Sequence, residues 1–251
     1  MPLDHTKSLE NYRLLAHRHD RATRRIEAVR RLAVASLGLE RGESVIDVAC
    51  GTGFCFAPIL EAIGPEGTLF AFDQSGALLA QAHERVLRAD WTNVVLLEST
   101  AETVDFRPWI ARRGARVPTA VLFSYAHDVM QSDAALRNIL AHAQAGARVA
   151  ATSTKLLPRS LWPASALVNR YLWRTHERYI TARDRNFDQP WRLLAGYLSD
   201  LRVRVLWPGW RYVAFGRLAA NAARGPWTIR ALRGATGEEP DIDGVRAQPL
   251  N

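Results

Sequence analysis

Residues 44–73 read SVIDVACGTGFCFAPILEAIGPEGTLFAFD, in which two apolar runs flank a glycine-bearing turn and a helix-like segment. Short, nearly continuous apolar runs rich in β-branched residues are typical of strands that are buried on both faces of a parallel sheet. The stretch therefore predicts a strand, a tight turn, a helix and a second strand that ends on a single acid, Asp73.

The same alternation continues along the chain. Apolar runs recur at 94–97, 119–124 and 148–152, and helix-like segments at 56–63, 77–88 and 133–143 separate the runs. This order predicts βαβ units in a doubly wound parallel sheet with helices on both faces. Two later runs, 202–206 and 212–215, flank the short turn 207–210, which permits only an antiparallel pair. We expect an α/β fold with a mostly parallel seven-stranded sheet, an antiparallel hairpin at one edge and a helical lid.

The length of 251 residues and the hydrophobic content of 48% suit one domain with appendages. Periodic apolar positions predict amphipathic helices between residues 11 and 37, and the aromatic-rich segment after residue 155 also has helical periodicity. The expected regions are N-terminal helices (1–40), an α/β core (41–155), a helical lid (156–199), the hairpin (200–224) and a flexible tail (225–251).

The net charge of +8 leaves two interpretations open, an anionic partner or solvated faces of arginine-rich helices. No apolar run approaches the roughly 18 residues of a membrane span, so we expect a soluble protein. The chain has two cysteines, Cys50 and Cys55, which favours a reducing cytoplasm over a disulfide framework. Two thiols are also too few for a thiolate metal site, and we expect no metal.

The turn after the first strand is the expected ligand site, because open parallel sheets bind ligands beyond the carboxyl ends of their strands. Gly51 and Gly53 allow a ligand to approach the backbone closely. Asp73 ends the next strand and would lie beside that turn, where a carboxylate can accept hydrogen bonds from two ribose hydroxyls. These features predict a nucleoside ligand.

The turn lacks the signature of a phosphate site. In a dinucleotide-binding G-x-G-x-x-G turn a third glycine packs the helix against the strand, and here that position is Phe56. The chain also has no G-x-x-x-x-G-K-[ST] run for a triphosphate.

Asp47, the turn ACGTG at 49–53 and Asp73 together resemble the first two motifs of the class I S-adenosylmethionine-dependent methyltransferases, and the resemblance extends over residues 12–215. It implies S-adenosylmethionine as cofactor, with the methionine part above the turn, its amino group at Asp47, the ribose at Asp73, and the helices of 1–40 over the site. The cofactor-binding residues that it implies are Tyr12, Asp47, Ala49, Gly51, Gly53, Asp73, Gln74, Thr100, Ala101 and Ser124.

Two positions depart from the family pattern. Ala49 stands where the family has its first turn glycine. Thr100, followed by Ala101, stands where the family usually has an acid at the adenine edge, so a hydroxyl replaces a charged contact to the exocyclic amine.

Methyl transfer is an in-line displacement that depends chiefly on positioning, and a general base helps only a hydroxyl acceptor. The end of the fourth strand, AVLFSYAHDVM at 120–130, supplies the candidate catalytic residues Tyr125, His127 and Asp128. His127 could be a base that Asp128 orients. The alternative that we favour is that His127 begins a helix and only packs or caps.

This strand end lacks the D/N-P-P-Y/F motif with which amino-methyltransferases grip a flipped base, so we expect no nucleic-acid substrate. The lid contains Trp162, Tyr171, Trp173, Tyr179 and Trp191 among many arginines. It resembles, loosely, the lids of lipid head-group N-methyltransferases and natural-product methyltransferases. A lipid acceptor would bring the lid to an anionic membrane surface, so a peripheral membrane contact stays open.

We therefore expect methyl transfer to a small-molecule amine or hydroxyl acceptor. The alternative is a methyltransferase fold that has been repurposed for a non-methylating reaction such as a cyclisation, with the cofactor as a structural element.

Overall fold

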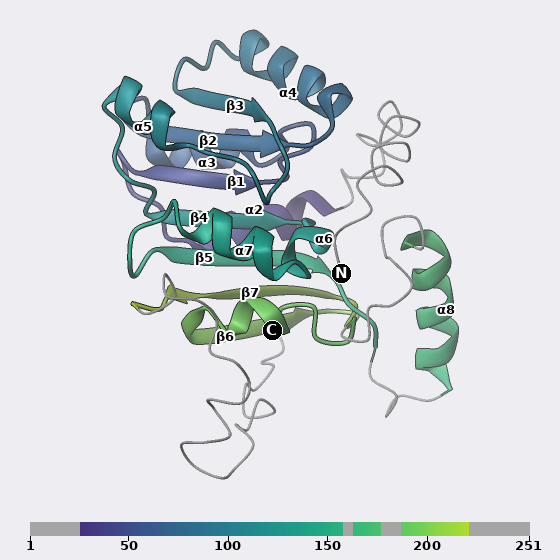
Figure 1. Ribbon diagram of the computed structural model, residues 1–251. Helices are drawn as coiled ribbons and strands as arrows, with labels where there is room; N and C mark the ends of the chain where they lie inside the picture. The colour runs from purple at the N-terminus through teal and green to yellow at the C-terminus, as the bar shows by residue number, and fades with distance from the viewer. Residues whose placement is uncertain (1–25, 158–162, 177–186, 221–251) are drawn as a thin grey trace.

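The computed structural model describes residues 26–157, 163–176 and 187–220. Seven strands of these residues form one sheet in the order β3-β2-β1-β4-β5-β7-β6 (Figure 1). The strands are β1 (Ser44–Val48), β2 (Thr68–Asp73), β3 (Val94–Glu98), β4 (Ala120–Ser124), β5 (Arg148–Thr154), β6 (Leu198–Leu206) and β7 (Arg211–Leu218). Neighbours among β1–β5 are parallel, whereas β7 runs antiparallel to both β5 and β6. The predicted α/β sheet with an edge hairpin is confirmed.

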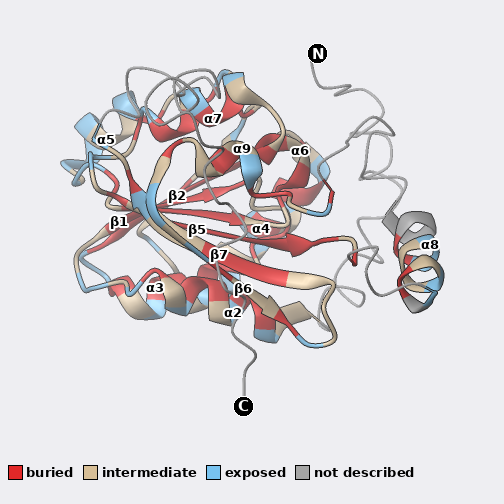
Figure 2. Cartoon of the chain, turned by 90° about the horizontal axis from the view of Figure 1, so that it is seen from below, coloured by how far each residue is buried: buried red, intermediate tan, exposed pale blue. Residues whose placement is uncertain are grey.

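Helices cover both faces of the sheet (Figure 2). One face packs against α2 (Glu27–Ser36), α3 (Phe56–Ile63) and α4 (Gly76–Arg88). The other packs against α5 (Arg107–Arg113), α6 (His127–Met130), α7 (Asp133–Leu140) and α9 (Arg192–Ala195). The lid helix α8 (Ala164–His176) stands beyond the carboxyl ends of the parallel strands (Figure 1). None of the helices in the described ranges has the length and hydropathy to cross a membrane.

The pleat of β1 decides where its one charged side chain points. Ile46 and Val48 enter the core beneath α5–α7, whereas Val45 enters the core beneath α2 and α3. Because successive side chains of a strand point to opposite faces, Asp47 points to the α2 and α3 side with Val45. The apolar pattern of the strand thus places a carboxylate inside the protein.

The strand order creates a crevice. The chain proceeds outward from β1 through β2 to β3 and then returns to place β4 on the other side of β1. Ligands of open α/β sheets bind at such a reversal, beyond the carboxyl ends of the strands. The turn at residues 49–53 follows β1 at this point.

The edge hairpin differs in extent from the prediction. Strand β6 begins at Leu198 rather than at Arg202, and its pairing with β7 shifts register between Ser199 and Arg202. Asp200 adopts a left-handed φ of 53° within this bulge. A polar Ser-Asp pair is typical of a turn, so the sequence pattern concealed the first part of the strand.

A half-buried ion pair joins strands at the opposite, amino-terminal end of the sheet. The Arg148 guanidinium binds both carboxylate oxygens of Glu43 and also donates to the carbonyl of Gly38 at 2.9 Å. Thr119 donates to the same carboxylate at 2.9 Å. The cluster ties the segments that enter β1, β4 and β5 to the end of α2.

We expect Arg148→Met to lower the free energy of unfolding by about 2 kcal/mol, because it leaves the partly buried carboxylate of Glu43 without its cation. Denaturant titration measures the loss. Glu43→Gln with Arg148→Met should recover part of it, and an unchanged midpoint in the single variant would contradict the assigned role.

Candidate functional site

The turn after β1 has an unusual backbone. Ala49, Gly51 and Gly53 adopt left-handed φ values of 51°, 58° and 78°. The Cys50 amide donates to the carbonyl of Phe72 at 2.9 Å, which fastens the turn to the end of β2. A left-handed alanine costs on the order of 1 kcal/mol, so Ala49, unlike a glycine, stores strain at this point.

The two glycines have different roles. A Cβ on Gly53 would lie 2.7 Å from the ring of Phe56, so this glycine lets the first turn of α3 pack against the loop. A Cβ on Gly51 would meet no described atom within 4 Å. The open side of Gly51 is therefore a place where a ligand can approach the backbone.

Asp73 closes β2 with its carboxylate turned toward that turn. One oxygen accepts from the Gly51 amide and the other from the Ser75 amide, both at 2.9 Å. The residue is 6% exposed. Burial raises its pKa, although the hydrogen bonds from the backbone oppose that shift. Each carboxylate oxygen can accept a second hydrogen bond, so both retain capacity for ligand hydroxyls.

Asp47 lies deeper, with 1% exposure, and neither carboxylate oxygen has a hydrogen-bond partner among the described residues. Burial raises its pKa to about 7, with Arg30 opposing the shift and Asp73 adding to it. Buried polar atoms are almost always satisfied, so a carboxylate in this state indicates a missing donor.

Arg30 is the site residue that the sequence analysis missed. It projects from α2 with 6% exposure, and its guanidinium carbon lies 4.8 Å from the ring centroid of Phe54 and 5.4 Å from that of Tyr125. Its charge acts on Asp47. The available signal was its position on the apolar stripe of α2, next to Val29 and three residues before Ala33.

The end of β4 contributes two hydroxyls. Those of Ser124 and Tyr125 are buried without a hydrogen-bond partner in the described part of the chain. Tyr125 has a left-handed φ of 58°, which is rare for an aromatic residue and is a mark of functional sites. Burial raises the pKa of Tyr125 to about 12, against the opposing charges of Arg211 and Arg30. At neutral pH the phenol is therefore a hydrogen-bond donor and not a base.

His127 is the first residue of α6, and it is buried with its ring 4.6 Å from that of Phe187 in an edge-on contact. Asp128 follows in the same helical turn and is half-buried. His127 thus begins a helix and packs against an aromatic ring, which is the arrangement that the sequence analysis favoured. A base role for His127 with Asp128 stays a prediction.

The residues expected around adenine follow β2 and β3. Gln74 is half-buried next to Asp73. The Thr100 hydroxyl lies 2.9 Å from that of Thr103, and Ala101 is buried with its carbonyl bound by Asn138. In the lid, Trp191 packs against Tyr212, whereas Tyr171 is exposed. Tyr12, Trp162, Tyr179 and the side chain of Trp173 lie outside the described residues.

The similarity to known proteins extends over the turn at residues 49–53 and Asp73. Residues 24–117 match the model of the ubiE/COQ5 methyltransferase family. This match, which covers less than half of the chain, supports a similarity to the class I S-adenosylmethionine-dependent methyltransferases. The aklanonic acid methyltransferase DauC of Streptomyces sp. is 28% identical over 152 residues, which are 52% of this chain and 66% of that protein. A demethylmenaquinone methyltransferase of Listeria monocytogenes is 37% identical over 27% of this chain and 29% of its own. The alignments thus span about two thirds of one relative and under a third of the other.

Solved structures support the fold of the chain. A methyltransferase from Aquifex aeolicus has a TM-score of 0.52 at 18% identity and covers 78% of this chain and 93% of its own. An O-methyltransferase from Thermotoga maritima has a TM-score of 0.51 at 12% identity, with 77% and 65% covered. At such identities the likeness concerns the architecture alone.

The state of Asp47 has a measurable effect on stability. Its folded pKa of about 7 lies above the usual 3.8, so its ionisation destabilises the ligand-free protein increasingly as pH rises from about 4 to about 7. We expect Asp47→Asn to raise the free energy of unfolding at pH 8 by about 2 kcal/mol, and much less at pH 5. Denaturant titrations at both pH values measure this. A gain that does not depend on pH would show that folding does not raise the pKa of Asp47.

Proposed function

We propose that this methyltransferase transfers the methyl group of S-adenosylmethionine to a small-molecule acceptor. The observation that carries the proposal is the pair of buried carboxylates, Asp47 and Asp73, which face the same glycine turn from neighbouring strands. Asp73 accepts one backbone hydrogen bond on each carboxylate oxygen, whereas Asp47 has no donor among the described residues. This arrangement suits a ligand with a diol and an ammonium group.

A residue of the site can be assigned to each of several parts of the cofactor. The cofactor supplies a methyl group on a sulfonium. Asp73 would accept from the ribose hydroxyls, and the open side of Gly51 would admit the chain between ribose and amino acid. Asp47 would receive the ammonium group, and Arg30 would bind the carboxylate. A buried anion and a buried cation side by side match the two charges of an amino acid.

The acceptor would bind beyond β4, where Ser124 and Tyr125 present their hydroxyls. Lys155, at the end of β5, is buried, and burial lowers its pKa. Arg211 begins the adjacent β7 and acts on Tyr125. Cations and a neutral phenol favour an acceptor with a hydroxyl or an acidic group over a cationic amine. Two relatives are named for small molecules, aklanonic acid and demethylmenaquinone, which supports this class.

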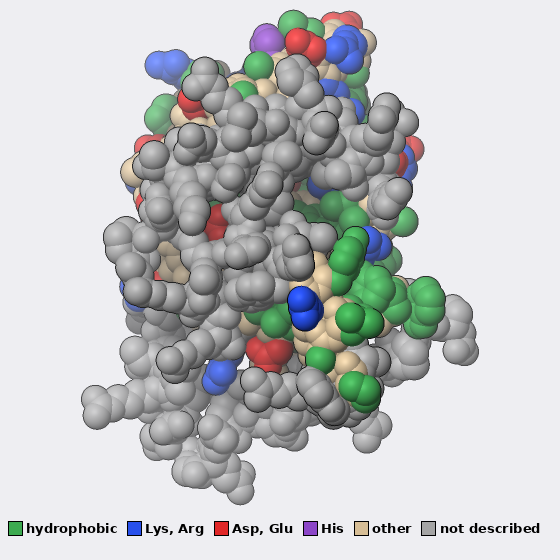
Figure 3. Space-filling model, turned by 90° about the vertical axis from the view of Figure 1, so that its right-hand side faces the viewer, with side chains coloured by type: hydrophobic (Ala, Val, Ile, Leu, Met, Phe, Trp, Pro, Cys, Tyr) green, Lys and Arg blue, Asp and Glu red, His purple; other side chains and the backbone are tan. Residues whose placement is uncertain are grey.

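The lid would form the outer wall of the acceptor site. Figure 3 faces this side of the molecule and shows hydrophobic side chains gathered over α8. Leu167 and Tyr171 of α8 are exposed there. An apolar acceptor body would be covered from this direction while its polar end meets Tyr125.

Turnover with S-adenosylmethionine labelled in its methyl group tests the function. The acceptor panel contains phenols, quinols, aromatic acids and amines. We expect label in one of the hydroxyl or acid classes, with an equal amount of S-adenosylhomocysteine. Asp73→Asn should lose the cofactor and all transfer. An acceptor that is converted without label, with S-adenosylhomocysteine supporting the reaction equally, would instead establish a non-methylating enzyme.

The assignment of Arg30 predicts a selectivity. The wild-type protein should bind S-adenosylhomocysteine about 10- to 100-fold more tightly than its decarboxylated analogue, because a carboxylate bound to a buried guanidinium contributes about 1.5–3 kcal/mol. Arg30→Met should bind the two ligands alike.

Arg85→Met is the matched control. Its guanidinium also lies 4.8 Å from the Phe54 ring, but its Nε donates to the carbonyl of Thr52 at 3.0 Å. Calorimetry should show that this variant keeps the preference for the carboxylate. Equal loss of preference in both variants would assign the effect to packing around Phe54.

A further inference from the structure

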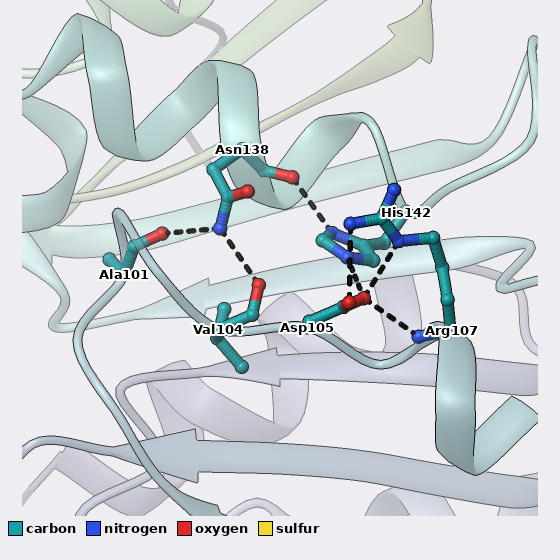
Figure 4. Close-up of polar contacts among 6 residues, drawn as sticks. All are labelled: Ala101, Val104, Asp105, Arg107, Asn138 and His142. Carbon is teal, nitrogen blue, oxygen red and sulfur yellow. Dashed lines mark hydrogen bonds and ion pairs between the residues drawn. The ribbon is translucent and has the colours of Figure 1, made fainter.

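The loop between β3 and α5 has no regular secondary structure over most of its length, yet it is fixed in place from one side. It contains Thr100 and Ala101, which the resemblance to methyltransferases implies at the adenine edge of the proposed cofactor site. Its contacts to α7 and the residues flanking α7 hold it (Figure 4). Apart from Ala101, the residues that make these contacts are not among those that the family resemblance marks.

Asn138 is the centre of these contacts. Its side-chain amide nitrogen donates to the carbonyl of Ala101 at 3.0 Å and to the carbonyl of Val104 at 2.9 Å (Figure 4). An amide group carries two N–H donors, so these bonds use both. One side chain thereby fixes the distance between two backbone carbonyls of the loop.

Two further contacts flank Asn138. The hydroxyl of Ser132 donates to the Glu102 carboxylate at 3.1 Å. The ring of His142 lies between the carbonyl of Asn138, at 2.8 Å from Nδ1, and the carboxylate of Asp105, at 3.1 Å from Nε2 (Figure 4). Three side chains therefore hold the loop at four of its residues.

The orientation of the loop matters because its recognition groups are few. Thr100 and Ala101 would contact the adenine ring through a hydroxyl and through backbone atoms. Neither residue has a long side chain that could keep its contact if the loop were displaced. Hydrogen bonds weaken steeply when their geometry departs from linearity. Contacts from a neighbouring element of the fold therefore have to hold this loop in position.

We propose that Asn138 is a positioning residue that sets the selectivity of the cofactor site for adenine. This inference rests on the proposed function. Asn138 does not touch the cofactor; it holds the carbonyls on either side of residues 102 and 103, and so holds the adenine edge in register with Asp73.

The test compares two ligands, S-adenosylhomocysteine and S-inosylhomocysteine, in which a carbonyl oxygen replaces the exocyclic amine. We expect the wild-type protein to prefer the adenosyl ligand. Asn138→Asp keeps the shape of the side chain but removes both donors, and it should weaken binding of the adenosyl ligand by about tenfold while reducing the preference toward unity. Asn138→Ser, which retains one donor, should be intermediate and covers the case in which the aspartate variant does not fold.

Asn93 offers a matched control. Its amide nitrogen also donates to two carbonyls, those of Gly64 and Gly67, each at 2.9 Å. That loop enters β2 at the amino-terminal end of the sheet, away from the site. Asn93→Asp should lower the thermal midpoint about as much as Asn138→Asp does, without changing the preference between the two ligands.

The outcomes are distinct. An unchanged preference in Asn138→Asp, an equal change in Asn93→Asp, or a wild-type protein that binds both ligands alike would each overturn the inference while leaving cofactor binding established. Failure of the wild-type protein to bind either ligand would reject the proposed function, and this inference with it.

Discussion

The hydrogen bond from the Gly51 amide to the Asp73 carboxylate is the contact on which the site depends. It joins the turn after β1 to the end of β2, and it can form because Gly51 adopts a left-handed φ that turns its amide toward the acid. A side chain at Gly51 would strain that conformation and occupy the open space beside it. The bond therefore sets both the shape of the turn and the direction in which the carboxylate faces.

Two buried carboxylates near each other destabilise the ligand-free fold, and the protein offsets this in two different ways. Asp73 is stabilised by backbone amides, whereas Asp47 faces the buried charge of Arg30 and has its pKa raised to about 7. Backbone amides are fixed by the fold, whereas Asp47 has no donor among the described residues, and a ligand can supply one. Ala49 and Tyr125 add backbone strain at the same place, as is common at functional sites.

The parts of this structure that sequence could predict are those encoded by local patterns. The strands β1 and β2, the glycine turn and Asp73 follow from apolar runs and turn residues within 30 positions. Arg30 was missed because its one signal is its place on the apolar stripe of α2, and the neighbouring Arg31, of the same residue type, is exposed and paired with Glu27. In the sequence, Asn138 cannot be told from an ordinary polar residue on the surface of a helix. Its role depends on a loop that lies more than 30 positions away in the sequence. Tertiary contacts of this kind leave no periodic signal.

The helices α6 and α7 connect the two ends of the site. α6 follows Tyr125 and packs against the acceptor side through His127 and Phe187, and α7 begins three residues after α6 and holds the loop at the adenine edge. The hydroxyl of Tyr197 donates to Asp133 at 2.6 Å, which ties the start of α7 to the segment that enters β6. The loop that contains Thr100 and the contact between His127 and Phe187 thus share one structural support, the unit formed by α6 and α7.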